Sequence, residues 1–135
     1  MEADALVAAA LSGIPRAKVA ALIDLMSGMF VAVEPAPDDT STLDLFAATV
    51  KELYDGDLTQ GLRVPAADLS TSDELDGNQS VRVIVVAGDE ALRVLVRMQA
   101  QPNLVLAVIC PANANLGLSL AKARHLAMTH EVEGV

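Results

Sequence analysis

Residues 104–119, LVLAVICPANANLGLS, pass from an apolar run into a corner rich in Asn and then into a helical pattern. The run LVLAVIC is apolar at every position, which is typical of a strand buried on both faces in the middle of a sheet. The corner either binds a phosphate at a helix N-terminus or only turns the strand into the helix. It holds no Lys or Arg, and the P-loop pattern is absent, so we interpret it as a turn. We expect Asn113 or Asn115 to cap the helix and Gly117 to let the helix lie close to the sheet.

The segment before this run predicts a β-hairpin. Residues 81–87, VRVIVVA, and residues 91–99, ALRVLVRMQ, flank a Gly88-Asp89-Glu90 turn. The second arm alternates as a half-buried antiparallel strand does, with one face formed by Leu92, Val94, Val96 and Met98 and the other by Arg93, Leu95 and Arg97. The first arm is apolar on both faces apart from Arg82. As a free edge it would aggregate unless a partner strand paired with it.

The N-terminal half shows a helix, two strands and a second helix. Residues 3–12 predict a short helix, and residues 17–34 predict two strands around a Ser27-Gly28 turn, where Gly28 supplies the positive φ of a tight hairpin. Residues 42–54 predict a helix with Ser41 as its N-cap and Gly56 at its end. Its apolar stripe is formed by Leu43, Phe46, Ala47, Val50, Leu53 and Tyr54. A last helix over 115–130 carries a stripe of Leu116, Leu120, Ala123 and Ala127.

These elements predict one α+β domain over residues 1–135. The links between neighbouring strands are short, so we expect a mostly antiparallel five-stranded sheet flanked by three helices. Residues 57–80 have no clear pattern and are rich in Gly, Pro, Ser and Asp. We expect them to form a mobile, acidic loop.

Composition excludes several classes of function. The net charge is -9 and the aromatic fraction is 2%, which disfavours nucleic acid and anionic membrane surfaces as partners. Cys110 is the only cysteine, and Glu2 and Asp4 stand where a secretory signal needs basic residues, so we expect a cytoplasmic protein. Residues 98–121 lack charge but contain prolines and asparagines, which excludes a spanning helix.

No residue cluster predicts catalysis or the binding of a metal or cofactor. His125 and His130 are five residues apart and have no neighbouring carboxylate, so we interpret them as surface residues. Cys110 ends an apolar strand, with no nearby base to make it a nucleophile. The loop acids do not follow the spacing of an EF-hand; they are Asp68, Asp73, Glu74 and Asp76.

The order of elements, together with residues 104–118, resembles the roadblock / dynein light chain family. The Gly13-Ile14-Pro15 corner and a hairpin bearing Asp24 and Gly28 fit the same pattern, while residues 57–80 depart from it. The resemblance covers most of the chain. It implies the order α-β-β-α-β-β-β-α in a roadblock/profilin-like fold. Members of this family dimerise through their third strands and central helices, and they act as non-catalytic platforms or regulators for Ras-like small GTPases.

Carried onto this chain, the resemblance implies an interface formed by Leu43, Phe46, Ala47, Val50, Tyr54, Val81, Val83 and Val85. We therefore expect a non-catalytic homodimer, without a cofactor, that binds and regulates a small Ras-like GTPase in the cytoplasm. The alternative is a small-molecule sensor domain of profilin-like or PAS-like type, which needs a pocket with converging polar groups.

Overall fold

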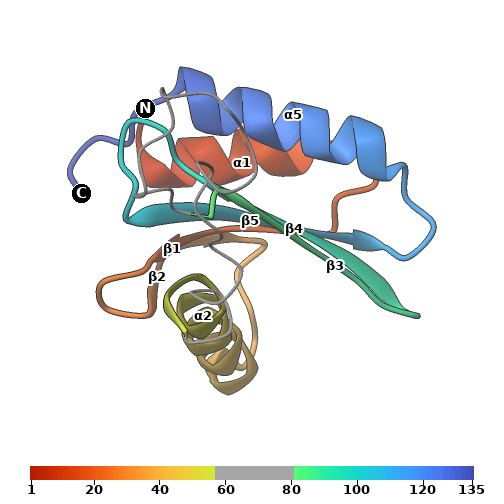
Figure 1. The fold of residues 1–135 in the computed structure, drawn as a ribbon, viewed down its shortest axis with the longest axis horizontal. Helices are drawn as coiled ribbons and strands as arrows, with labels where there is room; N and C mark the ends of the chain where they lie inside the picture. Colours follow the sequence, from red (N-terminus) through yellow and green to blue (C-terminus); the bar gives the residue numbers. More distant parts are fainter. Residues whose placement is uncertain (57–80) are drawn as a thin grey trace, which may run out of the picture.

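The computed structural model describes residues 1–56 and 81–135, which form a five-stranded antiparallel sheet with helices on both faces (Figure 1). The elements are α1 Ala3–Gly13, β1 Val19–Asp24, β2 Met29–Glu34, α2 Thr40–Asp55, β3 Val83–Ala87, β4 Ala91–Arg97, β5 Leu104–Pro111 and α5 Leu116–Thr129. Their order and the α+β class confirm the prediction from the sequence. The acidic loop expected at 57–80 lies outside the described residues.

The sheet has the strand order β2-β1-β5-β4-β3, and every neighbouring pair is antiparallel. As predicted, β5 is the central strand, and Leu106 pairs with Leu22 on one side and with Val96 on the other. The two edges of the sheet are therefore β2 and β3. This arrangement explains why β5 is apolar at every position, since both of its faces are covered.

Alternation along the strands divides the interior into two cores. Leu22, Val94 and Leu106 face α1 and α5, while Leu95 and Val105 face α2. Figure 1 shows α1 and α5 together on one side of the sheet and α2 alone on the other. Burying a side chain of this size contributes about 1.5–3 kcal/mol, so the sheet stabilises both layers at once.

Two turn predictions are confirmed. Gly28 has φ +72° in the turn between β1 and β2, a conformation that favours glycine because it lacks a Cβ. The side chain of Asn115 caps α5 by accepting a hydrogen bond from the Leu118 amide at 3.0 Å. The corner after β5 is thus built as a turn into a capped helix.

Three local predictions are wrong. Asp39, not Ser41, caps α2: its carboxylate accepts hydrogen bonds from the Ser41 amide at 3.0 Å and the Ser41 hydroxyl at 2.9 Å, and these bonds lower its pKa. Gly117 is exposed, and an added Cβ would meet only the Asn115 side chain at 3.6 Å, so this glycine permits no close packing on the sheet. Leu116 is 41% exposed, because the buried stripe of α5 begins at Ser119.

Candidate protein interface

The outer edge of β3 offers main-chain hydrogen bonds that its own sheet does not use. The Arg82 carbonyl accepts from the Arg97 amide at 2.8 Å, and the Gly88 amide donates to the Ala91 carbonyl at 2.9 Å, so even-numbered residues bond to β4. Successive residues of a strand direct their main-chain groups to opposite sides. The N–H and C=O groups of the odd-numbered residues of Val83–Ala87 therefore point away from β4, where no strand of the described ranges pairs with them.

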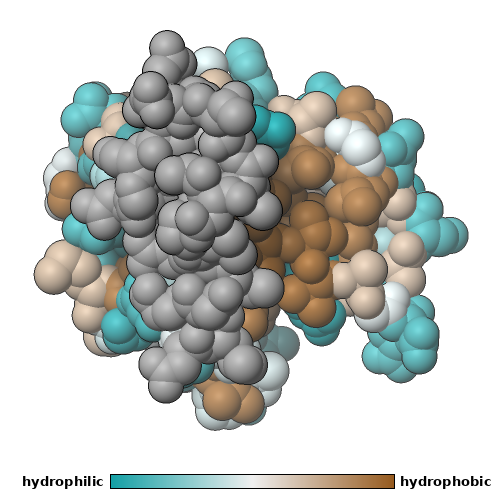
Figure 2. Space-filling model, viewed as in Figure 1, coloured by the Kyte–Doolittle hydropathy of each residue, from teal (hydrophilic) through white to brown (hydrophobic). Residues whose placement is uncertain are grey.

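This edge is also apolar. The strand reads VIVVA, without a charged residue or proline, and the side chains of Val85 and Val86 are 36% and 38% exposed. Figure 2 shows hydrophobic side chains gathered on the right-hand part of this face, in the region where Figure 1 draws β3. Proteins usually protect such an edge with charges, with proline or by covering it. The composition of β3 therefore favours a covered edge.

An apolar groove of about 340 Å³ adjoins the edge, between α2 and the strands β3 and β4. The helix packs against β1 and β2, so the face of β3 and β4 beside it is left as the floor of the groove. The lining residues are Thr42, Leu45, Phe46, Thr49, Val50, Leu53, Val86, Arg93 and Leu95. The helical members recur at three- and four-residue spacing, so they form one stripe along α2. Leu45 is 69% exposed on this stripe.

The structure separates the eight interface residues predicted from the sequence into two groups. Ala47, Val50 and Tyr54 are buried against their own sheet in the single chain. The others are half-buried or exposed along α2 and the β3 segment; they are Leu43, Phe46, Val81, Val83 and Val85. Only the second group has surface left for a partner.

Of the residues that line the groove, the predicted interface contained only Phe46 and Val50; among those it omitted are Leu45, Val86 and Arg93. Leu45 was the one large apolar residue of the helix outside the predicted stripe, and that position is the signal that could have found it. The place of Val86 and Arg93 in the groove depends on which strands α2 leaves uncovered. That is a property of the tertiary structure.

A buried tyrosine fixes the start of β3 to the end of α2. The Tyr54 hydroxyl donates to the Arg82 carbonyl at 3.2 Å, and the Arg97 guanidinium lies 4.9 Å from the centre of its ring. Arg97 also donates to the carbonyls of Val81 at 3.0 Å and Pro102 at 2.8 Å. Burial raises the pKa of the Tyr54 hydroxyl, partly opposed by the charge of Arg97. These contacts tie the start of β3 to the C-terminal end of α2.

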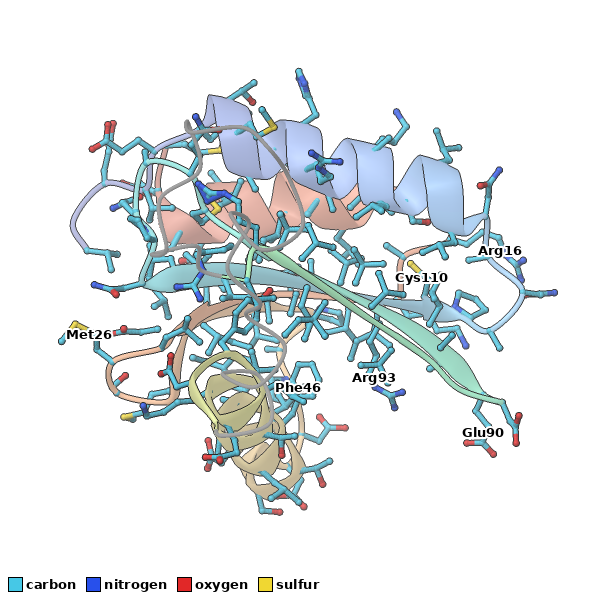
Figure 3. The ribbon with its side chains drawn as sticks, in the orientation of Figure 1. Arg16, Met26, Phe46, Glu90, Arg93 and Cys110 are labelled. Carbon is cyan, nitrogen blue, oxygen red and sulfur yellow. The ribbon has the colours of Figure 1, made fainter. Side chains whose placement is uncertain are left out.

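Arg93 is the cation of the groove. Figure 3 shows its side chain projecting from the sheet on the same side as Phe46 and α2. Within residues 1–56 and 81–135 its guanidinium makes no hydrogen bond or ion pair. An unpaired guanidinium beside apolar walls favours an anionic group on whatever fills the groove.

The described residues show little of the chemistry of an enzyme. They contain no group of three or more His, Cys, Asp or Glu side chains that could hold a metal ion. Burial raises the pKa of the Cys110 thiol, which keeps it protonated and unreactive. None of the helices in the two described ranges is long and apolar enough to cross a membrane.

Comparison with known proteins identifies the fold. No protein-family model and no curated protein sequence matches the chain. Among solved structures, the chain is similar to a roadblock/LC7 domain from Streptomyces avermitilis, with 23% identity, coverage of 94% of this chain and 92% of that one, and a TM-score of 0.65. It is similar to an MglB with a tetrameric arrangement, with 21% identity and a TM-score of 0.69. That match covers 93% of this chain and 82% of the MglB chain. It also resembles a profilin from Schizosaccharomyces pombe, with 14% identity and a TM-score of 0.61. That match covers 93% of this chain and 94% of the profilin chain.

These likenesses confirm the roadblock/profilin-like fold that the sequence predicted, over nearly the whole chain. A roadblock domain and a profilin, which are different kinds of protein, thus both match this fold. A fold alone does not determine a function. The features of this chain that bear on its function are therefore the edge of β3 and the groove.

Proposed function

We propose that the chain is a non-catalytic interaction module that forms a homodimer through β3 and α2, and that this dimer binds and regulates a small Ras-like GTPase. The observation that carries the proposal is the continuity between the free apolar edge of β3 and the apolar groove beside α2. A two-fold axis lets one edge pair with its own copy, because an isologous interface uses the same surface twice. Self-pairing is therefore the simplest way to cover both features.

The two features would be covered together. Antiparallel pairing of β3 with β3 of the partner would extend the sheet and satisfy the main-chain groups of Val83, Val85 and Ala87. Both α2 helices would then lie on the same face of the extended sheet, so the two grooves would meet at the axis. Burial of Leu45 and Val86 there would contribute about 25 cal/mol for each Å² of apolar surface removed from water.

The regulatory part of the proposal follows from the resemblance to roadblock proteins and is supported by the likeness to the roadblock/LC7 and MglB structures. The dimer would act by conformation: a preformed surface binds the GTPase switch regions in one state and shifts their populations. Nucleotide turnover would change although the platform contributes no catalytic group. The acidic composition and the single cysteine are consistent with a protein that acts in a reducing cytoplasm.

The first test is the mass of the chain in solution, measured by light scattering at micromolar concentration. We expect twice the 14.0 kDa of one chain. A stable monomer would remove the platform and leave the sensor alternative, in which an apolar small molecule fills the groove. The second test adds the dimer to purified Ras-like GTPases and follows phosphate release; unchanged turnover and no binding across the panel would overturn the regulatory part alone.

A further inference from the structure

Arg93 brings an unneutralised charge to the surface where the second copy would dock. It lines the groove with Thr42 and Phe46, which belong to the N-terminal half of α2. Covering an unpaired guanidinium with apolar surface is costly, whereas a carboxylate in reach of it offsets that cost. The segment that fills the groove is therefore expected to bring an acidic side chain to Arg93.

The partner's α2 carries one suitable acid. Of the acids in this helix, Asp55 already pairs with its own Lys51 at 3.4 Å. Glu52 follows Leu45 by seven residues, so the two lie on the same side of the helix. Asp44 precedes Lys51 by seven residues and lies on the other side. Glu52 is exposed, and its carboxylate has no hydrogen bond or ion pair in the described part of the chain.

The two-fold axis brings the correct ends together. The C-terminal end of α2 lies beside the start of β3, through the Tyr54 hydroxyl and the Arg82 carbonyl, while Thr42 near its N-terminal end lies in the groove with Val86. α2 and β3 thus run in opposite directions. A two-fold axis at β3 sets the N-terminal half of one α2 opposite the C-terminal half of the other.

We infer that Arg93 of each protomer pairs with Glu52 of the partner subunit, so that two reciprocal ion pairs close the groove and select a second copy of this chain. The inference rests on the proposed homodimer and specifies how it recognises itself. Charge pairs at an interface contribute to specificity because a wrong partner leaves a charge unpaired or repelled.

The experiment mixes two single variants, Arg93→Glu and Glu52→Arg. Each variant alone places like charges at both pairs of its homodimer, and we expect its dimer dissociation constant, measured by analytical ultracentrifugation, to rise about tenfold or more. An equimolar mixture restores opposite charges at both pairs of a heterodimer. We expect the mixture to dimerise within about threefold of the native chain, and the Arg93→Glu/Glu52→Arg double variant to do the same.

Asp44→Arg is the matched control, because it makes the same charge change on the other side of α2. Combined with Arg93→Glu in the same chain, it should restore nothing, because both Arg93→Glu side chains would still face Glu52 of the partner subunit. The ion pair would be overturned if the single variants dimerised with native affinity. It would also be overturned if the mixture had a dimer dissociation constant no lower than that of either variant alone. Both results would leave the homodimer in place. Recovery of Glu52→Arg by Arg82→Glu instead of Arg93→Glu would also overturn it, since it would show the opposite register. A monomeric native chain would refute the proposed function itself.

Discussion

Val85→Pro is the sharpest test of the free edge, because it separates pairing between chains from folding of one chain. The amide of Val85 points away from β4, so its loss removes no hydrogen bond within the sheet. Proline is tolerated on an edge strand where the N–H faces outward. We expect the variant to keep the far-UV spectrum of the native chain and, at concentrations where both are monomeric, its unfolding midpoint, while its dimer weakens.

The size of the effect follows from the geometry. In a two-fold pair each protomer loses one inter-strand hydrogen bond, so two bonds disappear from the interface. At about 0.5–1.5 kcal/mol each, the loss is about 1–3 kcal/mol, and since about 1.4 kcal/mol corresponds to a tenfold change, the dissociation constant should rise about tenfold to a hundredfold. The proline ring adds steric cost in the same direction.

The assay is sedimentation equilibrium over a concentration series, with chemical denaturation as the measure of folding. Val86→Pro is the neighbouring comparison: its amide faces β4 by the same alternation, so it should lower the unfolding midpoint of the single chain. If Val85→Pro dimerises like the native chain, the edge of β3 is not the pairing surface. If it unfolds as Val86→Pro does, the assignment of inward and outward amides is wrong.

The remaining predictions concern the groove, the tyrosine and the helix cap. Leu45→Asp should weaken the dimer about tenfold without changing the unfolding midpoint of the single chain, because Leu45 is 69% exposed; native affinity in sedimentation would exclude it from the interface. Burial raises the pKa of Tyr54, the only tyrosine, so the folded chain keeps a proton that the unfolded chain releases near pH 10. The free energy of unfolding should therefore fall as the pH rises above about 10, and this fall should be smaller in Tyr54→Phe; urea unfolding at pH 8 and pH 11 checks both, and an equal fall in the variant would contradict the reasoning. Asn115→Ala should cost about 0.5–2 kcal/mol in urea unfolding through loss of the cap, while Asn113→Ala should cost almost nothing; equal losses would refute the cap.

The sequence predicted the elements and their order because their signals are local. Alternation in residues 91–99 and the uninterrupted run of residues 104–110 set the faces and the centre of the sheet. The errors lie where several residues could do one task. The four consecutive residues Asp38 to Ser41, around the start of α2, are all good cap formers, and the choice of Asp39 over Ser41 depends on where the preceding chain leaves β2.

The interface was less accessible to sequence reasoning for a physical reason. A stripe of apolar residues indicates that a helix face is buried, but not whether its own sheet or another molecule buries it. In α2 the two outcomes separate: Ala47 and Val50 are buried against the sheet, while Leu45 and Thr49 stay exposed beside the groove. Only the placement of α2 over β1 and β2 distinguishes them, and that placement depends on contacts far apart in sequence.

Neighbouring residues of β3 differ in the directions of their main-chain groups and side chains, and so they make different contacts. The backbone of even-numbered residues holds the strand to β4, while the side chain of Val86 forms part of the groove on the α2 side. The backbone of odd-numbered residues faces outward, while Val83 and Val85 pair with Val96 and Val94 on the opposite face. In the proposed dimer, strand pairing would therefore depend on odd-numbered amides, and groove packing would depend on even-numbered side chains. Because different atoms carry the two contributions, Val85→Pro and Leu45→Asp should each weaken the dimer. Their combined effect should exceed either alone if both surfaces belong to one interface.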